Sequence, residues 1–334
     1  MRTKCAGECT MKTYFYSSFA GQLEEFVTHK KALGYSYTSS IIQLKQFDHF
    51  CKEQFPEESF LSKEIVHSWL QSRSEDSLGT RKIRLGCLRQ FALFLHNLGY
   101  NAYVAPKELL PSYKAYIPYV FSDEELTNFF TQIDSCSYWG GYPYRHLRLP
   151  VLFRLLYCCG LRLSEATHLR VRDFDLTQNV LIVRHGKFDK ERRVPLLEDM
   201  ASRCKHYAAN LPMCSDGSAY YFSASKGINP LSSATVYSNF REFLWKANIS
   251  HGGKGKGPRV HDFRHTFAVH RLRSWVREGK DLSAYLPLLK IYLGHSHFRE
   301  TAYYLRLTAD LYPDITEKVE RLFSDLIPQI KGEI

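Results

Sequence analysis

A histidine and a tyrosine near the end of the sequence have residue types and spacing suited to chemistry at a phosphate. Gly294 precedes His295, and Tyr304 follows nine residues later in a short segment flanked by apolar residues. Alone this spacing is a weak signal, because the chain holds 22 tyrosines and most tyrosines pack at core edges. Upstream motifs add arginines, a lysine and a second histidine. The resulting set suits the handling of a phosphodiester without metal and comprises Arg162, Lys187, His261, Arg264, His295 and Tyr304.

The tyrosine needs cationic neighbours before it can act as a nucleophile. Its hydroxyl has an ordinary pKa of about 10 and is a poor nucleophile at neutral pH. Cations stabilise both the developing phenolate and the target phosphate. Arg162 and Arg264 suit this role because a guanidinium binds two phosphate oxygens at once and stabilises the charge of the transition state.

Two histidines are candidates for moving the tyrosine proton or for hydrogen bonding to the phosphate, because histidine titrates near neutral pH. His261 lies three residues before Arg264, which places both on one face of a helix. His295 follows the glycine turn. His265 and His297 have no comparable support from spacing. A metal site formed by His295 and His297 is improbable, because cations already surround the phosphate.

The ordered set of Arg162, Lys187, His261-x-x-Arg264, Leu-Gly-His295 and Tyr304 resembles the tyrosine recombinase family, also called the phage integrase family. The resemblance covers the C-terminal two thirds of the chain at the spacings of that family. The N-terminal third is similar to the helical core-binding domain of the family. The combination of motifs is highly specific, although each motif alone is not.

The resemblance implies a site-specific DNA recombinase or integrase. Tyr304 is expected to attack a phosphodiester, form a 3′-phosphotyrosyl link and free a 5′ hydroxyl, and the 5′ hydroxyl of the partner duplex then reverses the step. The covalent intermediate retains the bond energy, so neither ATP nor any other cofactor or metal is expected. Two rounds of exchange through a Holliday junction imply four subunits on two double-stranded recombination sites, either a homotetramer or an assembly with related recombinase subunits.

Two assignments depend on details of the resemblance. The family carries its general acid, a lysine, on a β-hairpin, and lysine shifts its pKa readily near other cations. The position after this lysine is often glycine in the family but is Phe188 here, so Lys187 and Lys190 both remain candidates, with Lys187 favoured. Tyr303 and Tyr304 point about 100° apart on a helix, so only one faces the phosphate. The interval from His295, which the family shares, selects Tyr304.

Composition supports a DNA partner. The chain has 334 residues, a formal net charge of +11 and a pI near 9.1, and a basic protein favours a polyanion.

Apolar runs are too short for a membrane span and the start lacks a signal peptide, so we expect a cytoplasmic protein. The nine cysteines indicate reduced thiols. Cys5 and Cys9 resemble half of a metal site, but no second pair follows, so no metal is predicted.

The hydrophobic pattern predicts a mainly α-helical protein. Four amphipathic helices within residues 14–100 form a small bundle, and the last of them is expected to begin at Thr80. Its basic residues are candidate DNA contacts, and the resemblance strengthens that interpretation. A glycine-rich loop further on adds two lysines but lacks the order of a nucleotide-binding loop. The candidate DNA-contact residues are Arg81, Lys82, Arg84, Arg89, Lys254 and Lys256.

The remaining chain is expected to form a linker and a catalytic domain. Residues 101–120 contain three prolines and no helical pattern, which indicates the linker. Residues 121–310 form a mixed α/β catalytic domain, in which Ser122 and Glu125 predict a capping box. Residues 180–184 and 192–196 predict a β-hairpin with Lys187 near its tip. Residues 311–334 form a tail helix that either folds back or docks on a neighbouring subunit.

Two other functions stay open at this point. A type IB topoisomerase uses similar chemistry to relax supercoiled DNA, but the small helical bundle and the Leu-Gly-His motif favour a recombinase. A catalytically silent, sequence-specific DNA-binding factor would keep the fold for docking alone. The intact residue set argues against that class. Among recombinases, the sequence does not separate integrase, resolvase, invertase and transposase roles.

Overall fold

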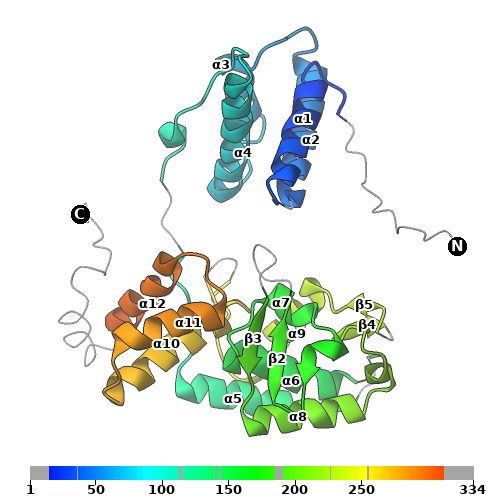
Figure 1. Cartoon of the computed structure of the whole chain (residues 1–334), viewed down its shortest axis with the longest axis vertical. Coiled ribbons are helices and arrows are strands. Elements are labelled where there is room, and N and C mark those ends of the chain that lie inside the picture. The colour runs from blue at the N-terminus through cyan, green and yellow to red at the C-terminus, as the bar shows by residue number, and fades with distance from the viewer. Residues whose placement is uncertain are drawn as a thin grey trace, which may run out of the picture. The chain divides into compact units, whose positions relative to one another are not determined.

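The chain divides into two compact units, Met1–Tyr116 and Ile117–Ile334 (Figure 1). The computed structural model describes residues 15–35, 37–112, 116–138, 140–142, 144–184, 191–225, 227–253 and 256–311. The two units are described separately below. The fold is mainly helical with small antiparallel sheets, as the sequence predicted.

The first unit is built from four helices whose apolar stripes meet in one core. The buried residues of this core include Phe26, Phe47, Trp69 and Phe91, one from each helix. The Ser62 hydroxyl accepts a hydrogen bond from the Ile65 amide and caps the third helix. The helices are α1 (Ala20–Ala32), α2 (Thr38–Gln54), α3 (Lys63–Gln71) and α4 (Leu78–Asn97).

Helix α4 begins two residues earlier than the sequence predicted. The Ser77 hydroxyl accepts from the Thr80 amide, so Ser77 rather than Thr80 marks the start of the helix. Thr80 instead lies in the first turn, with its hydroxyl 2.9 Å from that of Ser77. The error arose because both residues are good caps and only the backbone geometry separates them.

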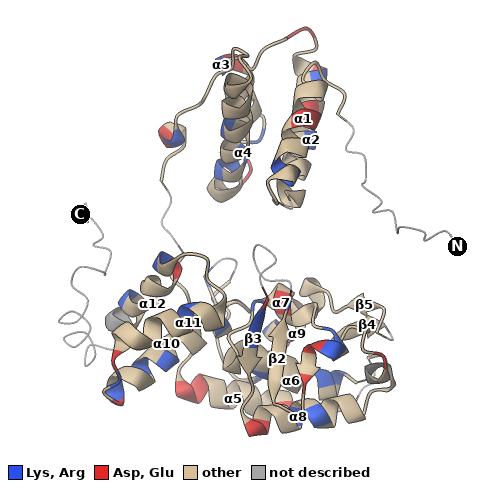
Figure 2. Cartoon of the chain, viewed as in Figure 1, with Lys and Arg blue, Asp and Glu red and all other residues tan. Residues whose placement is uncertain are grey.

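Arg84 on α4 does not present its guanidinium to a DNA partner as expected. Its side chain is only 5% exposed and forms an ion pair with Asp76 at 2.9 Å. The guanidinium also lies 5.1 Å from the Trp69 ring and 3.3 Å from the Gln46 amide oxygen. Arg84 therefore stabilises the helical bundle, whereas Arg81, Lys82 and Arg89 are partly exposed on the same helix. Figure 2 shows the basic residues of α4.

Much of the segment between residues 101 and 112 packs onto the first unit. Ala102 forms a bridge with Leu61, and the Tyr103 amide donates to the Leu61 carbonyl at 2.7 Å. Ala105 and Leu110 are buried in the same core, on either side of the short 3-10 helix η1 (Lys107–Leu109).

The second unit begins with the predicted capping box. The Ser122 hydroxyl accepts from the Glu125 amide, and the Glu125 carboxylate accepts from the Ser122 amide. Phe121, just before the cap, is fully buried and stacks on Phe263 with ring centroids 5.0 Å apart. The main core of the unit is formed by α5 (Asp123–Asp134), α6 (Arg145–Cys158), α7 (Leu163–Thr167), α8 (Glu198–Ala209) and α9 (Ser233–Lys246).

A three-stranded antiparallel sheet lies beside this core. The predicted hairpin is present as β2 (Val180–Val183) paired with β3 (Arg192–Pro195), with Leu181 opposite Val194. The two-residue strand β1 (Phe174–Asp175) and a separate pair, β4 (Ser223–Ser225) with β5 (Asn229–Pro230), were not predicted, because such short strands show no alternation. The short 3-10 helices η2 (Val171–Asp173) and η4 (Pro212–Ser215) complete this part.

Three C-terminal helices form a second cluster in this unit. Helix α10 (Asp262–Arg277) packs against α12 (Phe298–Leu311), α11 (Leu282–Leu293) and α6. Their shared core includes Phe267, Leu272, Leu289 and Leu305. The described part of α12 ends at Leu311, so the predicted tail helix lies outside the described residues.

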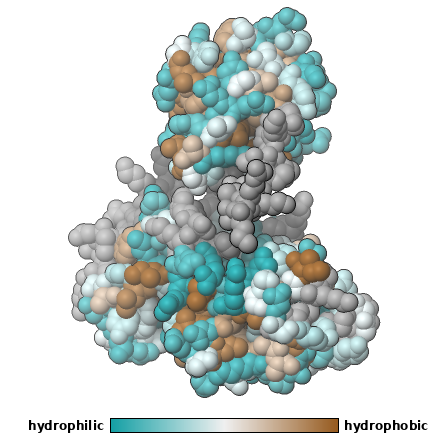
Figure 3. All heavy atoms as spheres, turned by 45° about the vertical axis from the view of Figure 1, so that its right-hand side comes forward, coloured by the Kyte–Doolittle hydropathy of each residue, from teal (hydrophilic) through white to brown (hydrophobic). Residues whose placement is uncertain are grey.

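The face of the molecule drawn in Figure 3 is mostly hydrophilic, with hydrophobic residues in separate spots. Within the described ranges, no helix is long and apolar enough to cross a membrane. Six cysteines of the described ranges are free thiols, and four of these six are buried.

Two glycines provide opposite tests of this fold. Gly160 has φ +56°, and a Cβ there would lie 2.7 Å from Phe267 Cδ1, so Gly160→Ala should lower the free energy of unfolding. We expect a loss of about 2–4 kcal/mol, because left-handed strain adds to overpacking. Gly86, in the middle of α4, has open space around it, so Gly86→Ala should raise stability by about 0.5–1 kcal/mol.

Urea denaturation followed by circular dichroism measures both changes. An unchanged midpoint for Gly160→Ala would contradict the close packing between the end of α6 and α10.

Candidate active site

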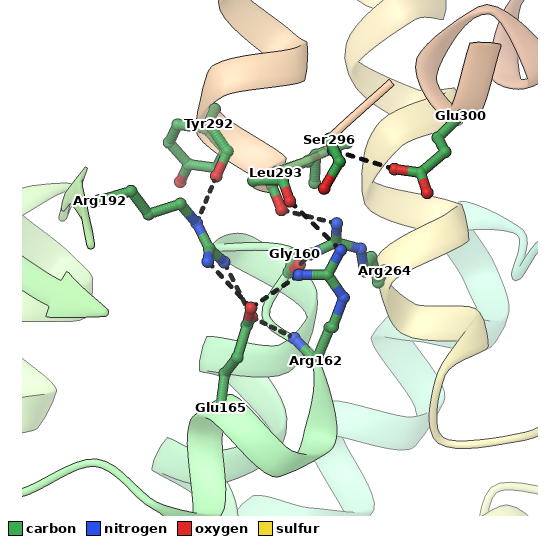
Figure 4. Close-up of polar contacts among 10 residues, drawn as sticks. Gly160, Arg162, Glu165, Arg192, Arg264, Tyr292, Leu293, Ser296 and Glu300 are labelled. Carbon is green, nitrogen blue, oxygen red and sulfur yellow. Dashed lines mark hydrogen bonds and ion pairs between the residues drawn. The ribbon is translucent and has the colours of Figure 1, made fainter. Parts of the chain in front are cut away.

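The site is organised around Glu165, a buried carboxylate in the first turn of α7. Its oxygens accept hydrogen bonds from the Arg162 backbone amide at 2.8 Å and from Arg162 Nη1 at 2.8 Å. The Arg192 side chain adds two further bonds, Nη1 to Oε1 at 2.9 Å and Nη2 to Oε2 at 2.8 Å (Figure 4).

Glu165 stays ionised because of these two arginines. Burial alone would raise its pKa, but hydrogen bonding and charge from Arg192, followed by the amide and charge of Arg162, hold the pKa at about 2. A fully satisfied buried carboxylate of this kind fixes the orientation of both guanidiniums.

The C-terminal end of α11 supplies the next set of contacts. Three consecutive carbonyls there each accept from a different arginine (Figure 4). Arg192 Nε donates to Tyr292 at 2.8 Å, Arg264 Nη2 to Leu293 at 2.7 Å and Arg162 Nη2 to Gly294 at 3.4 Å. Because the last carbonyls of a helix lack intrahelical partners and carry partial negative charge, they suit cations.

Gly294 makes this arrangement possible. It ends α11 with φ +67°, and a Cβ there would lie 3.0 Å from Arg192 Nη1. A larger residue would therefore both strain the turn and push against Arg192. The turn delivers His295 directly after the three carbonyls.

Arg264 is the most enclosed of the cations. It is 1% exposed, and besides Leu293 it donates from Nη1 to the Gly160 carbonyl at 2.7 Å. Burial, followed by the charge of Arg162, lowers the pKa of Arg264 to about 10, so it remains protonated at neutral pH. Since a guanidinium has five N–H groups, further donors remain on Arg264 and Arg162 for a phosphate.

Tyr304 lies in this cluster, whereas Tyr303 points away. The Tyr304 side chain on α12 is 3% exposed, compared with 40% for Tyr303. Its hydroxyl lies 3.1 Å from His265 Nδ1, and its ring stacks against the ring of His295 at 5.9 Å. Burial raises the pKa of Tyr304, and the charges of Arg264 and Arg162 oppose that rise.

The histidines of the site are neutral at pH 7. His295 Nδ1 lies 2.8 Å from the Thr301 hydroxyl, which orients its ring. Burial and then Arg264 lower the pKa of His295 to about 3, and burial, His261 and Arg264 lower that of His265 to about 3. His261, at the start of α10, is exposed, and its ring lies 4.8 Å from that of His265.

The structure thus brings together Arg162, Arg264, His295 and Tyr304, with His261 at the edge of the cluster through its contact with His265. Two participants were missed. Arg192 shares the inward face of β3 with buried Val194, so strand alternation contained a signal for it. His265 was discounted, because only the packing of α10 against α12 brings it to Tyr304.

Several predicted residues cannot be compared with the structure. Lys187, Lys190 and Lys254 lie outside the described residues, as do Cys5 and Cys9. Lys256 and His297 are described, and both are exposed. Among the residues that the structure describes, no group of three or more His, Cys, Asp or Glu side chains is arranged to hold a metal ion.

The chain resembles known proteins along nearly its whole length. Residues 133–310 match the family model of the phage integrase family. Over 320 residues the chain is 31% identical to the putative integrase/recombinase y4rE of Sinorhizobium fredii, covering 93% of this chain and 98% of that protein. A second protein of that organism, the putative integrase/recombinase y4rB, is 28% identical over 324 residues, covering 92% of this chain and 99% of its own length.

The fold is also similar to a solved structure, that of the XerH site-specific recombinase bound to palindromic difH substrate in a post-cleavage complex. The TM-score is 0.63 at 20% identity, covering 91% of this chain and 84% of the XerH chain. The chain therefore belongs to the phage integrase family. It is a tyrosine-type DNA strand transferase, a site-specific recombinase or integrase, which confirms the class predicted from the sequence.

The neutral histidines predict a pH dependence of stability. The unfolded chain binds a proton on His295 below its ordinary pKa of 6.5, whereas the folded protein does so only near 3. Stability should therefore fall as the pH drops from 6.5 towards 3. In His295→Gln the number of protons taken up on unfolding between pH 7 and pH 5 should decrease by up to about one.

The unfolding free energy at a series of pH values measures this uptake, with the exposed His297→Gln variant as control. The same pH slope in His295→Gln and wild type would contradict a buried, neutral His295.

Proposed function

We propose that Tyr304 is the nucleophile that attacks the scissile phosphate of a DNA recombination site. The observation that carries the proposal is the enclosed position of its hydroxyl, beside His265 and within the cluster of Arg162 and Arg264. The new bond joins the Tyr304 oxygen to phosphorus, and the bond from phosphorus to the 5′ oxygen breaks. A 3′-phosphotyrosyl link and a free 5′ hydroxyl result.

Arg162 and Arg264 are proposed to bind the non-bridging phosphate oxygens. Glu165 and the carbonyls of α11 already orient both guanidiniums, so little reorganisation is needed when the phosphate arrives. Positive charge held in a site of low exposure acts strongly on the extra negative charge of the transition state.

His265 is proposed to accept the Tyr304 proton. Its Nδ1 is within hydrogen-bonding distance of the hydroxyl, and its lowered pKa keeps the ring neutral and able to accept. His295, oriented by Thr301, is proposed to hydrogen-bond to the phosphate, and His261 to assist from the start of α10.

The leaving 5′ oxygen needs a proton, and Lys187 remains the proposed general acid, with Lys190 as the alternative. After cleavage, the 5′ hydroxyl of a partner duplex attacks the phosphotyrosyl bond and releases Tyr304. Energy of the original phosphodiester is kept in that link, so the proposed cycle uses no ATP.

Recombination between two duplex sites requires four cleavages, and we propose a homotetramer on DNA with a Holliday junction intermediate. The helical first unit is proposed to be the core-binding domain, with Arg81, Lys82 and Arg89 facing DNA, and the exposed Lys256 of the second unit is a further candidate. The segment 311–334 is proposed to link neighbouring subunits. Because its proposed substrate is DNA inside the cell, the protein is proposed to act in the cytoplasm.

Two alternatives remain as outcomes of one assay. A type IB topoisomerase-like enzyme would trap DNA through Tyr304 but would not exchange strands between two sites. A catalytically silent DNA-binding factor would form no covalent adduct.

Covalent trapping on a nicked suicide substrate tests the nucleophile. Tyr304→Phe should abolish the covalent adduct, because phenylalanine has no hydroxyl, whereas Tyr303→Phe should keep it. Denaturing gel electrophoresis of the protein–DNA product measures the amount of adduct that each variant forms. An adduct that persists in Tyr304→Phe and disappears in Tyr303→Phe would reverse the assignment.

Arg192 provides a test of the arginine arrangement. Arg192→Lys keeps the positive charge but cannot bond to both Glu165 oxygens and the Tyr292 carbonyl together. We expect adduct formation to slow by about 10-fold to 100-fold, because small displacements of catalytic groups have effects of that size.

Arg193→Lys is the matched control, since Arg193 is the next residue and is exposed. Equal rates for the two variants would show that the bonds of Arg192 do not position the site.

A further inference from the structure

A cavity of about 600 Å³ lies in the second unit between α6 and α9, away from the residues of the active site. Its walls come mainly from the first two turns of α6 and the first three turns of α9. Arg145 and Arg148 contribute from α6, and Ala234, Thr235 and Ser238 contribute from α9.

Arg148 is buried at this cavity without a counter-charge. It is 7% exposed, and its Nε atom has no hydrogen-bond partner. Among the described residues, no carboxylate forms an ion pair with Arg148. Burying an unpaired guanidinium is unfavourable, and buried charges in proteins are normally paired or bound to a ligand of opposite charge.

Glu242, the carboxylate that lines the cavity, already has cationic partners other than Arg148. Glu242 pairs with Arg145 and also accepts from Lys246 Nζ at 2.8 Å. Arg145 further donates from Nε to the Asn239 side-chain oxygen at 2.8 Å. The two arginines and one carboxylate that line the cavity therefore leave an excess of positive charge there.

Helix dipoles add to this excess. The first turn of α6 contains basic residues and no acidic ones, and its N-cap, Tyr144, provides no side-chain hydrogen bond. Ala234 and Thr235, in the first turn of α9, also line the cavity. The N-terminal ends of two helices and a buried arginine thus border the same cavity, an arrangement that favours an anion.

We propose that this cavity binds a phosphate group of the DNA backbone, as an anchoring contact separate from the scissile phosphate. The inference depends on the proposed function, because it takes DNA as the source of the phosphate. Along α6, Arg148 lies roughly 15 Å from the end that leads to Arg162. That length corresponds to about four base-pair steps of a duplex, a distance over which one DNA molecule is able to contact both sites.

The salt dependence of DNA binding tests the contact. Losing one phosphate contact should make the slope of log K for DNA binding against log salt concentration less steep by about 0.9. We expect a change of this size in Arg148→Gln. Arg154→Gln is the matched control. It removes the same charge from the same helix, but Arg154 is already held by both oxygens of Asp134, at 2.7 Å and 2.6 Å.

A second variant covers the case in which Arg148→Gln does not fold. Ser238 lines the cavity at an exposed helical position, so Ser238→Glu adds a carboxylate that competes with DNA for Arg148. We expect its salt-dependence slope to become less steep by the same amount as in Arg148→Gln, or by more. Wild-type slopes in both Ser238→Glu and Arg148→Gln would overturn the proposal.

Inorganic phosphate distinguishes the source of the anion. If it raises the melting temperature of wild type but not of Arg148→Gln, while the DNA slope is the same in both, the cavity holds a free anion and the assignment to DNA is wrong. Adduct formation by wild type is measured in parallel. Its absence would refute the proposed function, whereas equal slopes with a normal wild-type adduct would refute only the anchoring contact.

Discussion

The C-terminal end of α11 is the point on which the active site depends. Three successive carbonyls there, those of Tyr292, Leu293 and Gly294, bind three arginines from distant segments of the chain. Glu165 binds two of the same arginines. Guanidiniums so close together would repel one another if unpaired, and burial would increase the cost. The helix end and one carboxylate offset that repulsion, so positive charge is concentrated where a phosphate can use it.

The same charges determine the protonation of the site. Burial and nearby arginines keep His265 and His295 neutral, and those arginines also favour the phenolate form of Tyr304 against the effect of its burial. A neutral imidazole next to a protonated phenol is the combination that proton transfer needs. The electrostatic arrangement and the proposed chemistry therefore have one cause, the group of arginines held by Glu165 and α11.

Local chemistry in the sequence predicted much of this arrangement, and tertiary packing decided the rest. The Ser122 capping box and the β2–β3 hairpin depend on residues close in sequence, and the structure confirms both. Contacts between distant segments were missed: His265 with Tyr304, and Arg192 with Glu165. Arg84 was predicted to contact DNA but is buried, again because of packing. Its ion pair with Asp76 and its contact with the Trp69 ring form only when the helices pack together.

The central claim is that Arg162 and Arg264 act on the charge of a single phosphate attacked by Tyr304. The most direct measurement compares adduct formation on a normal substrate with that on one carrying an uncharged methylphosphonate at the scissile position, in wild type and in Arg162→Ala. If Arg162 neutralises that charge, the variant should lose far less activity on the methylphosphonate than on the phosphate. Equal losses on both substrates would contradict the account.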